Sequence, residues 1–418
     1  MLREKGLTPR AAIGCLIFVV ACGSSDGSTG LFDADGGAGS AGAGGAGAGG
    51  GTGGNGGSGA VGASGGSSGS GGKAGAAGAG GCASPSADDD VDGDGFTKAD
   101  GDCDECKPEV NPGAYDIGGN GLDDDCNGTP DDPVVACDAA ITSIADDDPM
   151  NAARAIGLCR VAENGSWGVV SAKYVQIDGS PGAAALSHGL LPDFGPNVAV
   201  REGKRLLALS TGTARRPNDA GYQAPSGADM GTTANAPPGF PIDSPSCTVQ
   251  TANDKQAHDS IALELLLRTP SNVLSFEIDF DFYTYEFPQF VCSQFNDFFV
   301  ALQSPAPIGA LSGSIGFDQD KNPISVNSSL LSACTPQTAG GKPFQCLLGT
   351  AELMGTGFED HAATGWLGVK SPVDPSSEVM LRIGVWDMVD HIQDTTVLVD
   401  HFRWSTEAVS EPVTLPAP

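Results

Sequence analysis

The sequence predicts a mainly β protein, in which a jelly-roll-like β-sandwich follows a small acidic module and a disordered Gly-rich linker. Three observations predict this order. Residues 137–405 contain short runs of alternating apolar and polar residues, separated by Gly, Pro, Ser and Asn. Residues 88–132 hold sixteen Asp and Glu against two Lys. Residues 36–81 hold 25 Gly in 46 positions.

Residues 1–22 have the pattern of an export signal. Three basic residues precede the apolar run 11–21, which is too short to span a bilayer as a stable helix. The run ends in Val-Val-Ala-Cys-Gly, which resembles the lipobox of bacterial lipoproteins and makes Cys22 the expected lipid-bearing residue. An ordinary secretory signal or a membrane-anchored signal helix is the alternative. Gly23 is not the Asp of an inner-membrane retention signal, so we expect the outer membrane or cell surface of a bacterial envelope.

Residues 23–81 are expected to form a disordered stalk, because Gly, Ala and Ser cannot bury a core. The whole chain carries a net charge of −31. A surface of this sign repels nucleic acid and anionic lipid, so we expect no nucleic-acid partner and no docking on lipid by charge. Attachment to a membrane would therefore depend on the lipid at Cys22.

Twelve Cys are too many for a typical cytosolic chain of this size. Processing would remove Cys15 and lipidate Cys22, and the remaining even number indicates disulfides in an exported chain. The spacing does not determine their pairing. Neighbours in sequence are the natural pairs: Cys137 with Cys159, Cys334 with Cys346, and Cys247 with Cys292. The acidic module keeps the other four: Cys82, Cys103, Cys106 and Cys126.

The acidic module, residues 82–135, begins with a run of carboxylates that has the spacing of a calcium loop. With the first Asp of the run as position 1, acidic residues fall at positions 3 and 5, and Gly95 falls at position 6, where an EF-hand turns sharply. Position 12 is Gly101 rather than the usual Glu, so one of two later Asp residues must close the site. The candidate ligands are Asp90, Asp92, Asp94, Phe96 through its carbonyl, Asp102 and Asp104.

A second run in the module repeats this pattern. Its candidate ligands are Asp123, Asp125, Asn127, Thr129 and Asp131. Together with Asn-Pro-Gly-Ala at 111–114, the two runs resemble the metal-binding-motif repeats of bacterial surface proteins, which are akin to the calcium-rich repeats of thrombospondins. The module contains no His, Met or Trp, so its oxygen ligands favour Ca²⁺ over copper.

Two other interpretations of the module stay open. A merely acidic, solvated linker would carry the same charge but would not need the regular Gly and Cys positions. Cys103 and Cys106 also form a CxxC pair, which suits a redox or zinc site, although an exported chain favours disulfides. Because the module has few apolar residues, we expect metal and disulfides to stabilise it in place of a core.

The large domain is assigned to residues 137–405. Asp148-Pro149 and an Ala-rich stretch that ends at Gly157 predict a short helix with an Asp N-cap. In 276–282, apolar residues alternate with carboxylates, which places the apolar residues in a core and the carboxylates on the other face. Residues 379–385 and 398–404 alternate likewise. Residues 406–418 are expected to be a disordered tail.

Residues 283–299 read Tyr-Thr-Tyr-Glu-Phe-Pro-Gln-Phe-Val-Cys-Ser-Gln-Phe-Asn-Asp-Phe-Phe. This segment resembles the signature of the choice-of-anchor L domain, a Glu-Tyr-Pro-like step followed by Phe-Asn-Asp-x-Phe, with Phe287 in the Tyr place. The strand 394–400 also fits, and the resemblance covers about 140–405. It implies an exported surface protein with a variable attachment signal and no assigned catalysis.

Glu286, Asn296, Asp297 and Asp400 form a second candidate metal site. Jelly-roll domains that bind carbohydrate often hold a structural Ca²⁺ between an early loop and the last strand, and these side chains have suitable oxygens. The alternative is that Asn296 and Asp297 make turn hydrogen bonds while Asp400 faces solvent. The five His show no HExxH pattern and no Ser lies in a nucleophile elbow, so no catalytic residue is assigned.

These features favour a non-enzymatic, lipid-anchored surface protein, whose calcium-binding module presents a β-sandwich for adhesion or for binding a glycan or protein ligand. The alternative is a secreted or surface hydrolase of glycosidase type, with an accessory calcium module and a carboxylate pair drawn from Asp279, Asp281 and Glu286. A structural role as an envelope spacer is the third hypothesis.

Overall fold

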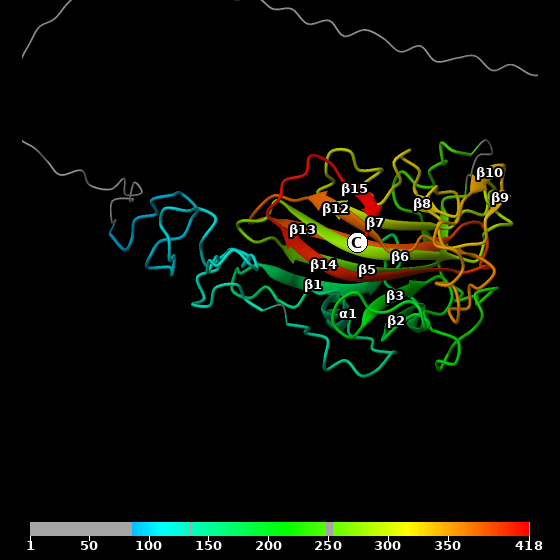
Figure 1. The fold of residues 1–418 in the computed structure, drawn as a ribbon, viewed down its shortest axis with the longest axis horizontal. Coiled ribbons are helices and arrows are strands. Elements are labelled where there is room, and N and C mark those ends of the chain that lie inside the picture. The colour runs from blue at the N-terminus through cyan, green and yellow to red at the C-terminus, as the bar shows by residue number, and fades with distance from the viewer. Residues whose placement is uncertain (1–85, 134, 248–253, 418) are drawn as a thin grey trace, which may run out of the picture. The chain divides into compact units, whose positions relative to one another are not determined.

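Two antiparallel β-sheets form the body of the computed structural model, which describes residues 86–133, 135–247 and 254–417 (Figure 1). The predicted mainly β class is therefore confirmed. The export signal, the Gly-rich linker and Cys82 lie outside the described residues. Within the described ranges, the chain has no helix that is both long and apolar enough to cross a membrane.

The first sheet has the strand order β1-β5-β13-β7-β8, and β4 pairs with the first residues of β5. Its apolar residues alternate as the sequence predicts, and Leu381 and Ile383 of β13 are buried. The strands are β1 (Gly168–Val175), β4 (Thr233–Asn235), β5 (Gln256–Arg268), β7 (Phe298–Ser304), β8 (Ile324–Ser325) and β13 (Glu378–Asp387).

The second sheet has the order β15-β12-β6-β14-β3-β2, and β11 pairs with β6. Its strands are β2 (His188–Leu191), β3 (Leu206–Ser210), β6 (Ser275–Thr284), β11 (Ala362–Ala363), β12 (Leu367–Pro372), β14 (Thr395–Ser405) and β15 (Val413–Pro416). A separate hairpin joins β9 (Gln337–Ala339) to β10 (Lys342–Phe344), and the 3₁₀ turn η1 (Ala185–Ser187) precedes β2.

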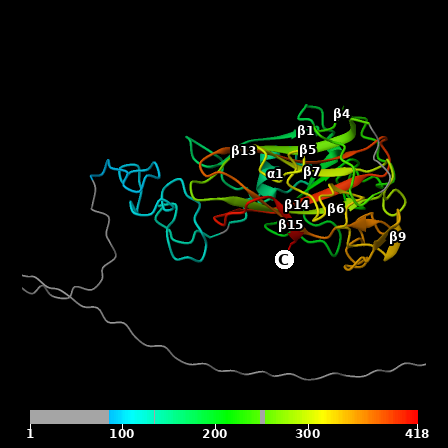
Figure 2. The ribbon, with the colours of Figure 1, turned by 90° about the horizontal axis from the view of Figure 1, so that it is seen from above.

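The long strands alternate between the sheets along the chain, from β5 to β6 to β7 and again from β12 to β13 to β14, as in a jelly-roll-like sandwich. Figure 2 shows the two layers, with β1, β5 and β7 in one and β6, β14 and β15 in the other. The core lies between them. Phe280 of β6 stacks on Phe299 of β7 with ring centroids 4.5 Å apart, so the predicted inward face of β6 is correct.

A single α-helix, α1 (Pro149–Ala155), lies in the described chain before the sandwich strands. The Asp148 side chain accepts a hydrogen bond from the Met150 amide at 2.9 Å, and Pro149 occupies the first turn. This is the predicted N-cap and Pro arrangement. Ala152, Ala153 and Ala155 are buried, so the short helix is held by packing on the sheet core.

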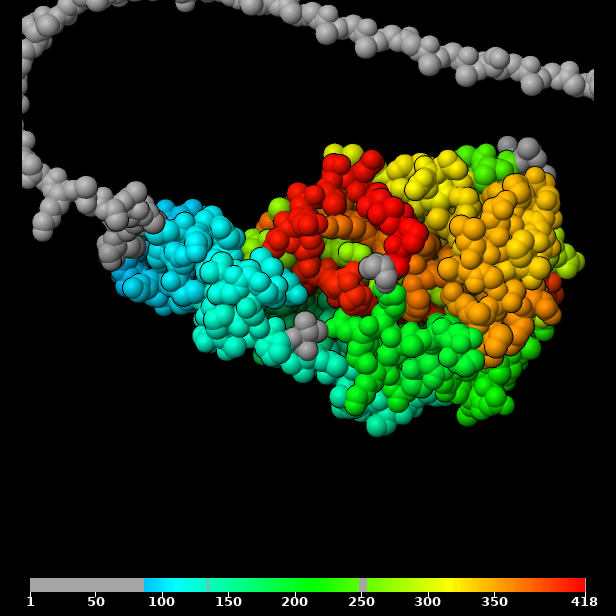
Figure 3. All heavy atoms as spheres, in the orientation of Figure 1, coloured from blue at the N-terminus to red at the C-terminus, as the bar shows by residue number. Residues whose placement is uncertain are grey.

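The outer face of β6 differs from the prediction, because Asp279 and Asp281 are buried rather than solvent-facing. A second apolar cluster, which includes Phe194, Leu353 and Phe358, covers this face of the second sheet. Figure 3 shows the surface around these loops, coloured green for the segment near 194 and orange for that near 355. Period-two alternation sets the two faces of a strand, but it does not say what covers each face.

The predicted disordered tail, 406–418, is wrong in part, because β15 lies within it. Residues 413–416 pair with β12 as the edge strand of the second sheet. Three of the four β15 residues are not buried, so the strand leaves little hydrophobic pattern in the sequence. Backbone pairing with an existing sheet edge, rather than side-chain burial, holds such a strand.

Candidate metal centre in the acidic module

The first acidic loop brings its three leading carboxylates together. Oxygens of Asp90, Asp92 and Asp94 all lie within 4.8 Å of one another. Asp90 accepts hydrogen bonds from the amides of Gly93 at 2.7 Å and Gly95 at 3.1 Å. Both glycines have positive φ, +83° and +94°, which other residues rarely adopt. The sequence Asp-Val-Asp-Gly-Asp-Gly therefore folds back on the first Asp, as a calcium loop does.

Asp102 and Glu105 close this loop. Burial and the carboxylates of Asp94, Glu105 and Asp92 raise the pKa of Asp102, which places it beside the loop. Glu105 accepts a hydrogen bond from the Val91 amide at 3.3 Å. Asp102 was one of two predicted closing residues. The other, Asp104, forms an ion pair with Lys107 at 2.9 Å and is not needed to explain the closure.

Four carboxylates around this loop share one hydrogen-bonding pattern. In each carboxylate, one oxygen accepts a hydrogen bond from a backbone amide. The other oxygen is buried and has no hydrogen-bond partner. Burial and the neighbouring carboxylates also raise the pKa of Asp94. Unpaired buried oxygens of like charge are costly unless a cation lies among them. The four residues are Asp92, Asp94, Asp102 and Glu105.

The second loop has the same local geometry but a different closing residue. Asp123 accepts hydrogen bonds from the amides of Asn127 at 3.0 Å and Gly128 at 2.9 Å. Asp125 also accepts from the Asn127 amide, at 3.2 Å. The Thr129 amide donates to the side chain of Asn127 at 2.8 Å, so the predicted positions 1 to 7 lie in one turn.

Asp131 does not join this loop, because it accepts hydrogen bonds from the amides of Gly119 and Gly121 at 2.7 and 3.0 Å. Asp132 takes its place, since it accepts from the Asn127 side chain at 2.8 Å. Burial and the carboxylates of Asp132 and Asp116 raise the pKa of Asp125. Asp116 and Asp132 therefore lie near this loop, although neither was among the predicted ligands.

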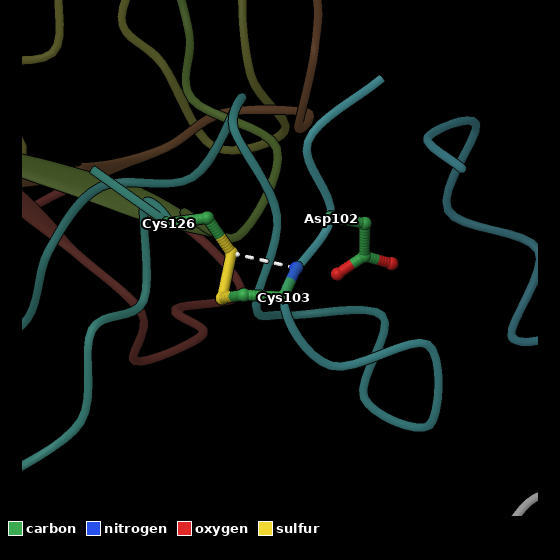
Figure 4. Close-up of side chains that lie close together, drawn as sticks. All are labelled: Asp102, Cys103 and Cys126. Carbon is green, nitrogen blue, oxygen red and sulfur yellow. Dashed lines mark hydrogen bonds between the residues drawn. A yellow bond between two sulfur atoms is a disulfide. The ribbon is translucent and has the colours of Figure 1, made fainter. Parts of the chain in front are cut away.

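A disulfide between Cys103 and Cys126 joins the two loops, and the Cys103 amide donates to the Cys126 sulfur at 3.1 Å (Figure 4). A carboxylate oxygen of Asp102 lies within 4.8 Å of both sulfurs of this bridge. Cys106 is also disulfide-bonded. Both cysteines of the CxxC pair are therefore engaged in disulfides, which argues against a zinc or redox site there. The other bridges are the three pairs named from the sequence: Cys137–Cys159, Cys247–Cys292 and Cys334–Cys346.

Asn111 connects the acidic module to the sandwich. Its side-chain oxygen accepts a hydrogen bond from the Ser271 hydroxyl at 2.7 Å. Its backbone N–H donates a hydrogen bond to the Asp124 carbonyl at 2.9 Å. The Asn111 side chain also contacts Asp94 of the first loop. The Asn-Pro-Gly-Ala segment is therefore the point at which both acidic loops and the sandwich meet.

A second set of contacts surrounds Asn111. Asn272 exchanges two hydrogen bonds with the backbone of Tyr115, at 2.8 and 2.9 Å. The Trp167 indole donates to the Ala114 carbonyl at 2.8 Å, and its ring meets that of Tyr115 edge-on. These contacts fix residues 111–115 on the sandwich through backbone atoms, so the sequence pattern alone could not show them.

The structure brings together three of the four residues predicted for the second metal site and places the fourth, Asp400, elsewhere. Asp297 donates its amide to the Glu286 carboxylate at 3.2 Å, so Glu286 and the Asn296-Asp297 pair lie together and buried. Asp400 instead accepts hydrogen bonds from the backbone of residues 201 and 202. It lies five residues along β14 from Thr395, which contacts Asp297. Five residues of strand span about 17 Å, so Asp400 is not a member of this site.

The three carboxylates of the hydrolase hypothesis are all buried. Asp281 accepts from the Thr364 hydroxyl, and Asp279 pairs with Arg201 and His401. None of the three lines either of two cavities in the described chain, of about 510 and 300 Å³. Comparison with known proteins adds no assignment: no family model matches the chain, and neither a curated protein nor a solved structure is significantly similar to it.

Proposed function

We propose that the chain is a non-enzymatic, lipid-anchored surface protein of a bacterial envelope, in which a calcium-binding module presents a β-sandwich for adhesion or ligand binding. One observation carries the calcium assignment. Four buried carboxylate oxygens around the first loop have no hydrogen-bond partner, and two of them belong to Asp92 and Asp94, whose carboxylates lie within 4.8 Å of each other and of Asp90. Hard oxygen ligands in this number suit Ca²⁺. The choice-of-anchor L resemblance supports the surface role.

The module is a stiff joint in this proposal. Calcium would neutralise the first loop, and Asn111 touches both that loop and Ser271 of the sandwich. Ion binding would therefore fix the segment that docks on the sandwich. The lipid at Cys22 and the Gly-rich stalk would hold this unit at the cell surface, and the sandwich would present the ligand-binding face.

Calcium titration of the full chain tests the assignment. Wild type should bind with a Kd of about 0.1–1 mM, the range of extracellular modules. The double variant Asp92→Asn/Asp94→Asn should lose one binding event, because it removes two of the converging charges. Asp88→Asn is the matched control, since Asp88 is exposed and outside both loops. Equal calcium binding by wild type and the double variant would contradict the proposal.

The ligand-binding role has its own test. A glycan array probed with the full chain in calcium should show binding to a restricted set of glycans. Complete silence on the array, with calcium bound, would favour the spacer hypothesis over adhesion to sugars. Release of reducing sugar from a polysaccharide by the purified chain would favour the hydrolase.

A further inference from the structure

One histidine and two aspartates meet near the start of β5. His391 lies in the loop between β13 and β14, Asp259 in β5, and Asp229 in the segment that precedes β4. The Nδ1 atom of His391 is 2.8 Å from an oxygen of Asp259 and 3.4 Å from an oxygen of Asp229. One potential ligand atom from each residue lies within 4.8 Å of the other two. We name these three residues the histidine cluster.

Backbone hydrogen bonds hold both carboxylates of the histidine cluster in place. Asp259 is buried and accepts hydrogen bonds from the amides of Met230 at 3.0 Å and Thr232 at 2.8 Å. Asp229 accepts one from the amide of Gly231 at 2.7 Å. The carboxylates are therefore fixed around the imidazole in advance, which lowers the entropy cost of binding an ion between them.

A second imidazole beside the histidine cluster lacks a hydrogen-bond partner. His258 is only 9% exposed, and neither of its ring nitrogens forms a hydrogen bond. Its ring meets that of His391 edge-on, with the ring centroids 4.6 Å apart. The Asp254 carboxylate is 3.6 Å from its Nε2 atom, which is too far for a hydrogen bond. Buried polar side chains normally have a partner, so this ring calls for one.

A local irregularity in β5 brings both imidazole neighbours to one place. Consecutive residues of a strand normally point to opposite faces of the sheet. Asp259 instead has a positive φ of +47°, and the pairing of β5 with β13 shifts between Val385 and Asp387. His258 and Asp259 therefore both reach His391, although they are adjacent in one strand.

The two imidazoles lie among carboxylates. Burial raises the pKa of Asp390, and His258 and His391 act against this rise, so that carboxylate also lies near both rings. Within the described residues, no Lys or Arg forms an ion pair with Asp390 or with the three carboxylates named above. Two protonated imidazoles in ring contact would repel each other. A divalent cation would instead compensate the carboxylates and leave both rings neutral, each with a lone pair to offer.

We propose that the histidine cluster binds one divalent transition-metal ion such as Zn²⁺, with His391, Asp229 and Asp259 as ligands. His258 is the fourth ligand, after a rotation of a ring that already touches that of His391. Imidazole with carboxylate suits Zn²⁺, whereas Ca²⁺ takes oxygen ligands. Ligand atoms about 2.0–2.1 Å from a tetrahedral Zn²⁺ lie about 3.4 Å from one another. The observed separations of 2.8 and 3.4 Å therefore need only a small expansion.

An ion at this position would join three segments of the sandwich: β5, the loop 388–394 and the segment before β4. The side chains of Asp229 and His391 are 65% and 29% exposed, so the ion could enter from solvent. The histidine cluster takes a different class of ion from the acidic loops and shares no residue with them. It therefore stands or falls separately from the proposed function.

Zinc titration of the full chain tests this site. The buffer contains excess calcium, which competes with zinc at sites made only of oxygen ligands. Wild type should bind one equivalent of Zn²⁺, and His391→Gln should weaken this binding by at least ~100-fold. His361→Gln is the matched control, because His361 is a part-buried His outside the cluster whose Nδ1 atom contacts the Phe287 carbonyl. The module variant Asp92→Asn/Asp94→Asn should keep the zinc-binding event, which separates the two kinds of site.

Cobalt provides a second readout. Co²⁺ can replace Zn²⁺, and it absorbs visible light much more strongly in a four-coordinate protein site than in water. Wild type should develop such a band that saturates at one equivalent of Co²⁺, and His258→Gln should weaken or shift it. A wild-type spectrum equal to that of aqueous Co²⁺, or an unchanged spectrum in His258→Gln, would contradict the four-ligand assignment.

In the alternative, the two His side chains are only proton-sharing partners of the carboxylates. Wild type and His391→Gln would then give the same zinc titration, and that result would overturn the proposal. If His391→Gln does not fold, Asp229→Asn gives the decision, because it changes an exposed side chain. An unchanged zinc affinity in Asp229→Asn would also overturn the proposal.

Discussion

Replacing Asn272 by Ala should loosen the acidic module from the sandwich without unfolding either. Asn272 makes two short hydrogen bonds to the Tyr115 backbone, at 2.8 and 2.9 Å, and a longer one to the Glu109 carbonyl at 3.4 Å. At about 1 kcal/mol for each short bond, the docked state loses about 2 kcal/mol. Opening of the contact should therefore become ~30-fold more frequent.

Hydrogen exchange at the Ser271 amide measures this opening. That amide donates to the Gly113 carbonyl at 2.9 Å, so it exchanges only when the module leaves the sandwich or the sandwich unfolds. Its exchange should accelerate ~30-fold in Asn272→Ala, while amides in the centre of β13 keep their protection. Asn197→Ala is the control, because Asn197 makes a single side-chain bond within the sandwich, to the Ala351 carbonyl.

Two results would refute this reasoning. An unchanged rate at Ser271 would mean that the Asn272 contacts do not hold the module. Equal acceleration at Ser271 and in β13 would mean that the substitution destabilises the whole sandwich. If the joint depends on calcium, EGTA should produce the same local acceleration in the wild-type chain.

Three further predictions follow from the core, a buried His and the expected anchor. Phe280→Ala should lower the free energy of unfolding in urea by about 3–5 kcal/mol, because it removes the ring that stacks on Phe299 in the core. The control Leu347→Ala, at an 86% exposed site, should change it by less than about 0.5 kcal/mol. Burial lowers the pKa of His188 from 6.5 to about 4 against the raising effect of Asp147, so the unfolded chain binds its proton first as the pH falls. Stability should then drop by up to about 3 kcal/mol between pH 6.5 and 4, and a His188→Gln chain with the same pH dependence would contradict this. Cys22→Ala should move the protein from the membrane to the soluble fraction of the envelope; persistence in the membrane fraction would favour an uncleaved signal helix.

Sequence patterns predicted much of the local structure because local rules govern it. Alternation over 276–282 placed Phe280 in the core, and Asp148-Pro149 marked the start of the helix. The spacing of carboxylates around Gly95 predicted the first loop, since a tight turn brings alternate residues to one side. These predictions needed only the geometry of one strand, one helix end or one turn.

Glu105 and Asp132 escaped prediction, unlike Asp102, because no local rule places them. Glu105 lies outside the twelve positions of the loop that it closes, and Asp132 replaced its neighbour Asp131 through a change in backbone direction. The same limit applied to Asp400, which the sequence grouped with Asp297 although it lies five residues, or about 17 Å, along β14 from Thr395, the strand residue that contacts Asp297.

By itself, then, the sequence determined the mainly β class, the short capped helix and the turn geometry of the acidic loops, because each depends on residues within about ten positions of one another. Tertiary structure alone decided that Asp279 and Asp281 are covered, that residues 413–416 form an edge strand, and that Asp387 lies beside Asp297. Those outcomes depend on how two sheets pack, and packing brings together strand ends that lie some 90 residues apart.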